Sequence, residues 1–246
     1  MASPLTQFEI KKIIPLEFFG YDISFTNSSL AMLSTTIVIS LFLILGLSKM
    51  SLIPSKRQSL VEISYEFIAN MINDNVGKDG MKYLSFIFTL FLFILLGNLL
   101  GMLPYSFTWT SHIIVTFTIS FFIFVGVTII AIYKHGILKF LSFFAPSGVP
   151  KPMLFLLVPI EVISYLSRPI SLSVRLFANM MAGHTLLKVI GGFVFVLASN
   201  SYIVGGILPL SFLVALTGLE IVIAFLQAYV FAILTCLYIN DAIHLH

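Results

Sequence analysis

Long apolar runs separated by short polar segments dominate the chain. Runs of membrane-spanning length cover residues 30–47, 83–103 and 111–133. A helix needs about 20 apolar residues to cross a hydrocarbon core of about 30 Å. We therefore predict one transmembrane helix in each of these three ranges.

Two apolar stretches at the end of the chain are longer than one perpendicular span requires. They cover residues 153–197 and 207–245, and at about 1.5 Å of rise per residue each exceeds the membrane thickness. Strong tilt removes this mismatch, so we expect a steeply inclined helical hairpin that turns near residues 199–206. Pro169 is expected to bend the first arm, because proline removes one backbone hydrogen bond.

Two segments outside these spans have other patterns. In residues 58–76, apolar positions recur at helical spacing between acidic ones, which predicts an amphipathic helix on the membrane surface or on a partner protein. The acidic polar face favours the partner. Residues 1–26 are rich in turn formers, and we predict a surface segment with a short helix near residues 4–14.

The predicted fold class is therefore all-α, in a single membrane domain over residues 1–246. It is a polytopic membrane protein with one span, an amphipathic surface helix, two further spans and a long steeply tilted hairpin. Lysine and arginine outside these helices gather mostly in segments 49–57, 78–82 and 134–151, whereas 104–111 has none. By the positive-inside rule, the N-terminus lies outside and the C-terminus inside.

Composition supports a membrane protein and excludes several other classes. Of the 246 residues, 59% are hydrophobic and 9% are charged, whereas soluble domains carry about 25% charged residues. The net charge of +3 and the lack of a basic run argue against nucleic acid as a partner. The single cysteine, Cys236, excludes an internal disulfide. Nothing near the first residues resembles a signal peptide, and no internal repeat is recognised. Because neither a phosphate-binding loop nor metal-ligand spacing is recognised, we expect no cofactor, metal or nucleotide site.

Polar residues inside the first arm of the hairpin are the main candidates for chemistry. A charged side chain at mid-membrane costs between about 2.5 and 17 kcal/mol, which makes such residues functional hypotheses. At about 100° per residue, Glu161 and Arg168 share a helical stripe with Arg175. Asn179 lies beside this stripe. His184 falls on the opposite face.

The second arm carries its own polar stripe. Glu220, Gln227 and Asp241 are spaced by seven and fourteen residues, so they lie within about 60° of one another on a helix. Glu220 is surrounded in sequence by apolar residues, which makes a purely structural role hard to support. For Gln227, helix-to-helix hydrogen bonding and a functional role are equally favoured.

The antiparallel arms bring these residues into two predicted pairs. His184 pairs with Glu220 toward the outside, and Glu161 pairs with Asp241 toward the inside. An imidazole and a buried carboxyl group can relay protons. Arg175 lies between the pairs, and its guanidinium stays charged and repels a passing proton.

This arrangement predicts two partial proton pathways that an electrostatic barrier separates. Such a pathway conducts only if a mobile carboxylate on a partner visits Arg175. His112 lies near a membrane interface, where an ordinary solvated histidine is the favoured interpretation.

Two segments of the hairpin resemble those of a known family. The segment SLSVRLFANMMAGH (residues 171–184), together with LTGLEIVIAFLQAYVFAIL (residues 216–234), resembles subunit a of the F-type ATP synthase. The resemblance covers nearly the whole chain. It assigns the family's essential arginine to Arg175, and its conserved asparagine and glutamine to Asn179 and Gln227.

The resemblance also implies roles for the titratable residues. The family's outer half-channel pair matches His184 and Glu220, and its inner half-channel acids match Glu161 and Asp241. The order of histidine and glutamate is similar to that in mitochondrial and alphaproteobacterial members. Gly101 stands where bacterial members have an acidic residue, which leaves open whether His112 helps to line the access path.

The partners that the resemblance implies are the c-ring of ATP synthase, the peripheral stalk and other membrane subunits, within the lipid bilayer. The transported ion is the proton, favoured over sodium by His184, and no nucleic acid is involved. The chain is not an enzyme on its own, because it contains no nucleotide site. The implied location is the mitochondrial inner membrane, with the bacterial inner membrane as the alternative.

Two other functions are weaker alternatives. A secondary transporter or ion channel would use Glu161, Arg175 and Glu220 as a substrate or ion site, but such proteins are usually built from repeated halves. A structural scaffold would use the polar residues to hold helices together. It does not explain an arginine, an outer pair and inner acids at graded depths.

Overall fold

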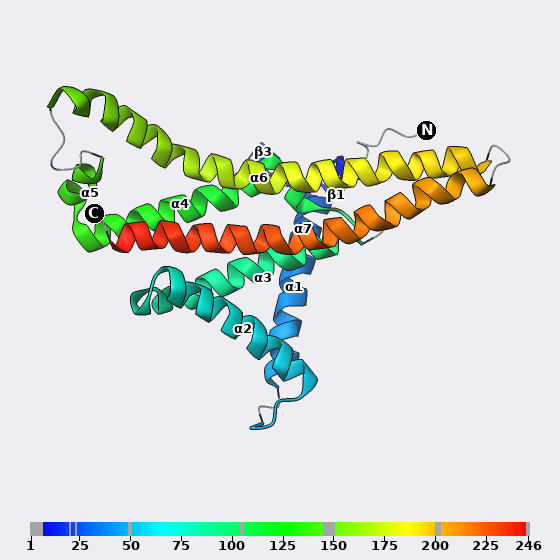
Figure 1. Ribbon diagram of the computed structural model, residues 1–246, viewed down its shortest axis with the longest axis horizontal. Coiled ribbons are helices and arrows are strands. Elements are labelled where there is room, and N and C mark those ends of the chain that lie inside the picture. The colour runs from blue at the N-terminus through cyan, green and yellow to red at the C-terminus, as the bar shows by residue number, and fades with distance from the viewer. Residues whose placement is uncertain are drawn as a thin grey trace. The chain divides into compact units, whose positions relative to one another are not determined.

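The protein is described by a computed structural model over residues 7–19, 21–22, 24–48, 51–103, 106–144, 151–199 and 203–244. Helices make up nearly all of this part of the chain (Figure 1), which confirms the predicted all-α fold class. The helices are α1 (Asn27–Leu47), α2 (Lys56–Asn75), the 3-10 helix η2 (Lys78–Tyr83), α3 (Leu84–Gly101), the 3-10 helix η3 (Trp109–Ser111), α4 (Ile113–His135), α5 (Ile137–Phe143), α6 (Lys151–Ser199) and α7 (Ile203–Ile243).

The helical stretches that are long and apolar enough to cross a membrane coincide with the predicted spans. In the described residues there are five of them: α1, the stretch Lys78–Gly101 that ends with α3, α4, α6 and α7. The amphipathic segment predicted at residues 58–76 is α2, and the two arms of the predicted hairpin are α6 and α7. A turn was predicted near residues 199–206; α6 ends at Ser199 and α7 begins at Ile203, and residues 200–202 lie outside the described residues. The tilt of the hairpin stays a prediction.

The N-terminal segment differs from the prediction. Where a short helix was expected near residues 4–14, the described part has short strands: β1 (Lys12–Ile14) pairs with β4 (Phe25–Thr26), and β2 (Glu17–Phe18) pairs with β3 (Tyr21–Asp22). Residues 1–6 lie outside the described residues. Asn27 explains the extended backbone, because its side chain accepts a hydrogen bond from the Lys11 amide and donates one to the Glu9 carbonyl. An ion pair with Lys12 lowers the pKa of Asp22 to about 2.

Local capping explains where several helices begin and end. The side chains of Thr26 and Ser55 accept hydrogen bonds from the third following backbone amide and cap the N-termini of α1 and α2. Gly77 and Gly136 follow α2 and α4 with φ of 78° and 80°, a left-handed conformation that glycine adopts without a steric penalty. Gly136 also separates α4 from α5, a short helix that the sequence pattern did not predict.

Packing divides the chain into two compact units. The first contains residues 1–48, 92–112 and 176–229, and the second contains residues 49–91, 113–175 and 230–246. Each unit therefore takes one half of the hairpin helices α6 and α7. Each has its own set of polar residues.

In the first unit, Trp109 connects α1 with the second half of α3. Its side chain is 1% exposed, its Nε1 donates to Thr35 Oγ1 of α1 at 3.3 Å, and its ring lies 4.8 Å from that of Phe93. A Cβ atom at Gly97 would come within 2.3 Å of the indole, so only glycine permits this close approach. Asn98 adds a hydrogen bond to the Ala224 carbonyl of α7 at 3.4 Å. The indole thus fixes the loop that precedes α4.

In the second unit, α2 packs on the first half of α3, and α5 packs against α6. The rings of Tyr65 and Phe67 in α2 contact those of Phe88 and Phe91 in α3. Ile68 is fully buried, and burying such a side chain contributes about 1.5–3 kcal/mol. One face of α2 thus packs on α3 of the same chain, and the predicted contact of α2 with a partner protein stays a prediction.

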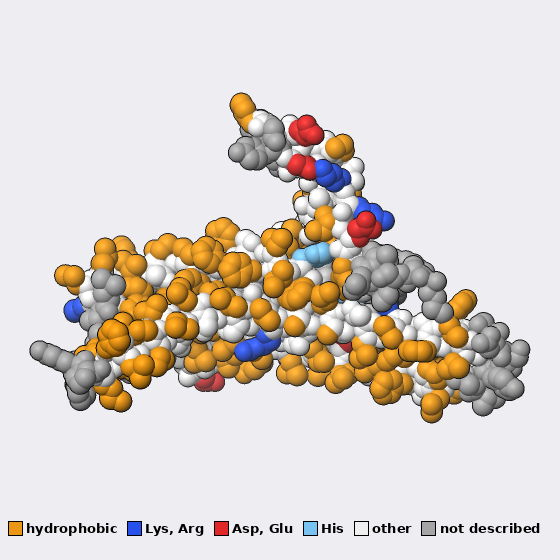
Figure 2. Space-filling model, turned by 90° about the horizontal axis from the view of Figure 1, so that it is seen from above, with side chains coloured by type: hydrophobic (Ala, Val, Ile, Leu, Met, Phe, Trp, Pro, Cys, Tyr) orange, Lys and Arg blue, Asp and Glu red, His pale blue; other side chains and the backbone are white. Residues whose placement is uncertain are grey.

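Large hydrophobic side chains remain exposed along the spanning helices. Examples are Phe122 in α4, Phe155 and Phe195 in α6, and Leu208 and Val214 in α7. On the face seen in Figure 2, hydrophobic side chains cover most of the surface and charged ones are few. Soluble monomers rarely expose contiguous apolar surface on this scale, so lipid or partner subunits cover it.

Candidate functional site

The first unit brings His184 of α6 and Glu220 of α7 together. His184 Nδ1 lies 3.8 Å from Glu220 Oε1, and the side chains are 12% and 6% exposed. The predicted pairing of these two residues is confirmed. At this separation a small side-chain movement brings the nitrogen and oxygen within hydrogen-bond distance.

The fold gives the Glu220 carboxyl group its place beside α6. Glu220 lies on the buried stripe of α7 that continues with Ala224, Gln227 and Ala228. On α6, Gly183 leaves room for it, because a Cβ atom there would lie 2.6 Å from Glu220 Oε1. Neither carboxyl oxygen has a hydrogen-bond partner in the described part of the chain. Since an unpartnered buried carboxylate is costly, the neighbouring imidazole is its natural source of a proton.

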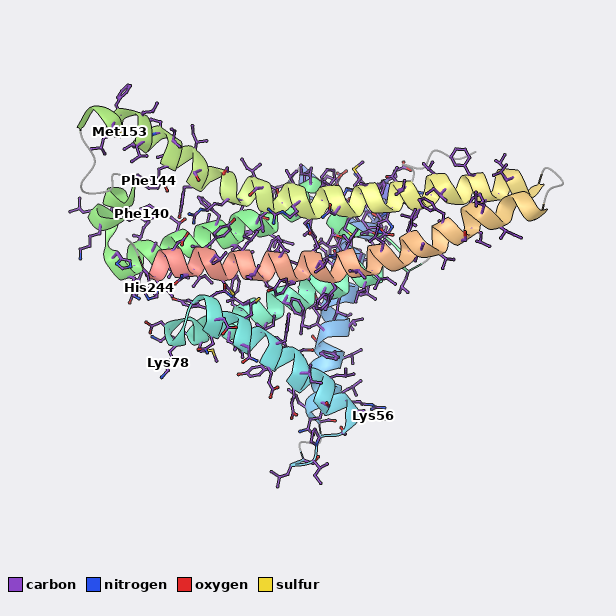
Figure 3. All side chains as sticks on the ribbon, in the orientation of Figure 1. Lys56, Lys78, Phe140, Phe144, Met153 and His244 are labelled. Atoms are coloured by element: carbon purple, nitrogen blue, oxygen red, sulfur yellow. The ribbon has the colours of Figure 1, made fainter. Side chains whose placement is uncertain are left out.

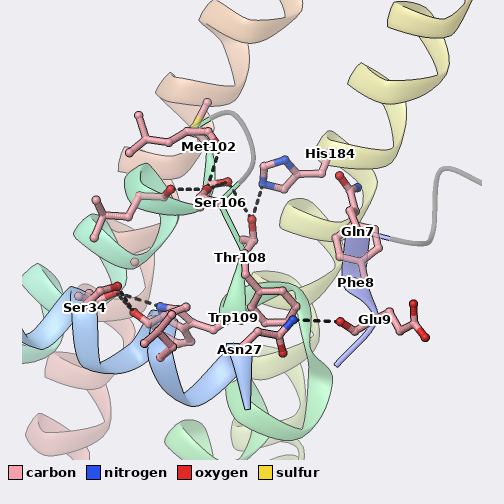
Figure 4. A pocket seen from close by; sticks show the side chains of 18 of the residues that line it. Gln7, Phe8, Glu9, Asn27, Ser34, Met102, Ser106, Thr108, Trp109 and His184 are labelled. Atoms are coloured by element: carbon pink, nitrogen blue, oxygen red, sulfur yellow. Dashed lines mark hydrogen bonds between the residues drawn. The ribbon is translucent and has the colours of Figure 1, made fainter. Parts of the chain in front are cut away.

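A large cavity reaches the other side of the His184 ring (Figure 4). It has a volume of about 970 Å³ and is bounded by the N-terminal segment, α1, the end of α3, the following loop and α6. Its charged lining residues are Glu9, Lys11 and Lys188. Thr108 stands between this loop and the imidazole, with Oγ1 at 3.1 Å from His184 Nε2. The cavity can therefore carry water to the histidine.

His112 lies outside this cavity lining and differs from the predicted solvated histidine. Its ring is half-buried and stacks on Phe107, with ring centroids 5.1 Å apart. Burial lowers the pKa of His112. Phe107, rather than His112, is the member of this ring pair that lines the cavity.

The second unit contains a different pair, Arg168 with Asp241. The Nη1 atom of Arg168 lies 3.0 Å from Oδ2 of Asp241, and the side chains are 20% and 46% exposed. The guanidinium also lies over the rings of Tyr165 and Tyr238, at 5.2 and 5.0 Å from their centroids. All four side chains line one small cavity. This is a fixed ion pair, because arginine stays protonated.

The pairing of Glu161 with Asp241 at the inner side stays a prediction, but the structure adds a partner for Asp241 that was not predicted. Asp241 pairs with Arg168, and in the described residues no ion pair holds the half-buried Glu161. In the view of Figure 3, Phe140 and Phe144 lie between the start of α6 and the end of α7. Both rings contact Tyr165, at 6.0 and 5.5 Å.

Arg168 was on the predicted stripe of α6, but its role as the partner of Asp241 was missed. The sequence did contain features that favour Arg168 as the partner of Asp241. Arg168 lies one heptad after Glu161 on the same face, and a long guanidinium side chain reaches further than a carboxylate.

Arg175 and Asn179 lie one turn apart on α6, and both are exposed. Within the described residues no hydrogen bond or ion pair holds Arg175, although its charge acts on the phenol of Tyr238. Gln227, by contrast, is buried in α7. Among the described residues, no group of three His, Cys, Asp or Glu side chains could hold a metal ion.

The fold and these sites define a class of protein: a multi-span membrane protein whose buried titratable pair meets a cavity. An arginine without an ion pair in the described residues is exposed on one of its spanning helices. A family model described as ATP synthase A chain matches residues 29–240, and the chain belongs to this family. It is thus a proton-translocating stator subunit of an Fo sector. It acts within that complex rather than as an enzyme by itself, and the transporter alternative is not favoured.

Relatives named ATP synthase subunit a match the chain over its full length. The protein from Pelagibacter ubique strain HTCC1062 is 60% identical over 246 residues, which cover 100% of this chain and 99% of the relative. The proteins from Mesorhizobium japonicum and Rhodospirillum rubrum are each 55% identical, covering 99% and 100% of this chain and 97% and 100% of the relatives. These relatives are bacterial, so they do not support the expected mitochondrial location.

Proposed function

We propose that His184 and Glu220 form the inner end of an outer half-channel that loads protons onto a moving carboxylate of a partner. Water in the cavity brings a proton to His184. The imidazole then passes it to Glu220, which lies within 3.8 Å and has no competing hydrogen bond in the described residues. The observation that carries the proposal is this buried pair at the wall of a cavity of about 970 Å³.

Arg175 is the stator charge in this mechanism. Its side chain is exposed and unpaired within the described part of the chain, so its countercharge has to come from another subunit. The c-ring of ATP synthase, with one membrane-embedded carboxylate per subunit, supplies that countercharge. A guanidinium cannot give up its proton, so it attracts the deprotonated carboxylate and blocks direct proton flow.

The contact with Arg175 has to be strong and transient. The neighbouring exposed positions Ser171, Ala178 and Asn179 are small or polar, which leaves room for water and for a close partner helix. Water raises the local dielectric constant and weakens an ion pair. We assign Asn179 and Gln227 supporting roles; Asn179 is exposed one turn from Arg175 on α6, whereas Gln227 lies on the buried stripe of α7.

The inner half-channel uses Glu161 and Asp241. Glu161 is half-buried and has no ion pair in the described residues, so we assign it the exchange of the departing proton. Asp241 supplies a negative charge whose position Arg168 fixes. The transmembrane potential drives the transfer with about 2.3 kcal/mol per charge per 100 mV.

The remaining partners and the location follow from the same assignment. The exposed acidic residues of α2 suit contact with the peripheral stalk or other membrane subunits. The cationic loops favour an N-terminus outside and a C-terminus in the cytoplasm. The bacterial relatives support the inner membrane of a bacterium as the location.

The test replaces Glu220 with glutamine in the complete complex, reconstituted in vesicles. Glu220→Gln keeps the side-chain volume but cannot exchange a proton, so ATP-driven proton pumping and passive proton conduction fall to background. Glu66→Gln is the matched control, because Glu66 is exposed on α2, and it pumps at the normal rate. Normal pumping by Glu220→Gln would overturn the proposal.

A further inference from the structure

Thr108 connects the end of α3 to the imidazole of the outer pair. Its side chain is 6% exposed. Its hydroxyl donates to the Gly101 carbonyl at 2.9 Å, and the same oxygen lies 3.1 Å from His184 Nε2. Figure 4 shows Thr108 pointing toward the His184 ring.

The direction of these hydrogen bonds follows from the number of hydrogens. A threonine hydroxyl has one hydrogen and two acceptor lone pairs. Gly101 is the last residue of α3, and its carbonyl oxygen, which has two lone pairs, accepts the hydroxyl hydrogens of both Thr108 and Ser106. Thr108 Oγ1 is then an acceptor toward His184, and Nε2 of the neutral imidazole carries the hydrogen.

This assignment leaves the other ring nitrogen facing the carboxyl group. With its hydrogen on Nε2, the neutral imidazole has a lone pair on Nδ1. That nitrogen is the one that lies 3.8 Å from Glu220 Oε1. The opposite tautomer would carry its hydrogen on Nδ1, so that nitrogen would have no lone pair with which to take up the next proton.

The surroundings hold Thr108 in place. A Cβ atom at Gly101 would come within 2.7 Å of both Oγ1 and Cγ2 of Thr108, so the glycine makes room for the threonine. The next residue is Trp109, which is buried and donates a hydrogen bond to the Thr35 hydroxyl. The hydroxyl therefore sits on a rigid part of the loop.

We infer that Thr108 is a positioning residue of the outer relay, which holds neutral His184 as the Nε2–H tautomer with Nδ1 as the proton acceptor toward Glu220. The inference rests on the proposed function of the His184–Glu220 pair. In the uptake step, a hydronium ion from the cavity protonates Nδ1, the basic nitrogen of this tautomer, and leaves a water molecule. In the transfer step, the N–H bond at Nδ1 of the imidazolium breaks and an O–H bond forms on the Glu220 carboxylate. The imidazole returns to the same tautomer, because the other hydrogen stays on Nε2, which donates it to Thr108 Oγ1.

Other charged groups also act on His184 and have to be kept constant in a test. Glu220 faces it from α7, and Lys188 lies one turn further along α6. Glu9 and Lys11 of the N-terminal segment line the same cavity. A pH profile therefore reports on the hydroxyl only when these residues are unchanged.

The first experiment compares Thr108→Val, which has nearly the same shape but no hydroxyl, with Thr108→Ser, which keeps the hydroxyl. Passive proton conduction by reconstituted Fo is measured against pH. Loss of one hydrogen bond is expected to reduce conduction about three- to tenfold in Thr108→Val and to shift its pH profile, whereas Thr108→Ser restores both. Thr118→Val is the control, because the Thr118 hydroxyl is exposed and donates a hydrogen bond to the Ile114 carbonyl of its own helix α4.

The second experiment observes the tautomer directly in the unaltered protein. Fo labelled with ¹⁵N-histidine gives ring-nitrogen shifts by solid-state NMR, assigned by comparison with His184→Gln. A protonated Nε2 with an unprotonated Nδ1 supports the inference, and a protonated Nδ1 in the neutral ring overturns it. If Glu220→Gln abolishes conduction while Thr108→Val keeps the normal rate and pH profile, this inference fails alone. If Glu220→Gln conducts normally, the proposed function fails.

Discussion

The His184–Glu220 pair and the Arg168–Asp241 pair each join a basic side chain of α6 to an acidic one of α7, but they differ in burial and in the nature of the cation. The first pair is 12% and 6% exposed, 3.8 Å apart and without further bonds on the carboxyl group in the described residues. The second is 20% and 46% exposed, 3.0 Å apart and flanked by two tyrosine rings.

This difference separates a group that moves protons from one that fixes a charge. Histidine can be neutral or charged near physiological pH, so a buried histidine–carboxyl pair can exchange its proton. Arginine stays charged, so its pair with a carboxylate keeps the same protonation state. The hairpin helices α6 and α7 thus carry a proton-exchanging pair and a permanent ion pair. The basic residue, histidine or arginine, decides which kind of pair forms.

The first prediction concerns the His184–Glu220 pair and disrupts it without substituting either residue. Gly183→Ala places a Cβ atom 2.6 Å from Glu220 Oε1, so the carboxyl group has to move away from its position beside His184. We expect proton conduction to fall about ten- to a hundredfold, because misplacement by about 1 Å has effects of this size. Conduction is measured in reconstituted vesicles.

The matched control lies on the same helix. Gly191 has no atom within 4 Å of an added Cβ, so Gly191→Ala retains normal conduction and gains up to about 1 kcal/mol of helix propensity. Equal conduction by the Gly183 and Gly191 variants would show that the close contact at Gly183 has no role in the relay.

The second prediction concerns the fixed pair and has a smaller effect. Arg168→Gln removes the ion pair and both ring contacts, while exposed Asp241 is partly screened by solvent. We expect a loss of about 1–2 kcal/mol, which lowers the unfolding temperature of the purified chain in detergent by about 2–8 °C.

The control for Arg168→Gln is the same substitution at Arg57, which is exposed at the start of α2 and leaves the unfolding temperature unchanged. Glu220→Gln sharpens the comparison. Replacing a buried carboxyl group that lacks hydrogen bonds by an amide is expected to leave the unfolding temperature unchanged. An unfolding temperature that drops with Glu220→Gln but not with Arg168→Gln would reverse the roles assigned to the two pairs.

The spanning helices and the outer pair could be predicted from the sequence because their signals are long-range and regular. Apolar runs of spanning length have few other structures available in a membrane. In an antiparallel hairpin, residues at equal distances from the turn face each other. His184 lies fifteen residues before the end of α6 and Glu220 seventeen after the start of α7, so their pairing followed from counting.

The contacts that sequence reasoning missed depend on tertiary packing. The ion pair of Arg168 with Asp241 was missed because it depends on the rings of Tyr165 and Tyr238 around the guanidinium, and α5, whose Phe140 contacts Tyr165, has no strong sequence pattern. The role of Thr108 depends on a loop whose course is fixed by the buried Trp109. In the N-terminal segment, the hydrogen bonds of Asn27 with Glu9 and Lys11 overrode the weak local preference for helix.

The most direct test of the account measures ATP synthesis by the complete complex with Arg175→Ala, in vesicles with an imposed pH difference and membrane potential. Arg57→Ala is the control for loss of an exposed arginine. We predict normal synthesis by the control and none by Arg175→Ala, because without the guanidinium the carboxylate of the partner has no countercharge and protons leak through without driving rotation. Synthesis by Arg175→Ala at the rate of the unaltered complex would contradict the account.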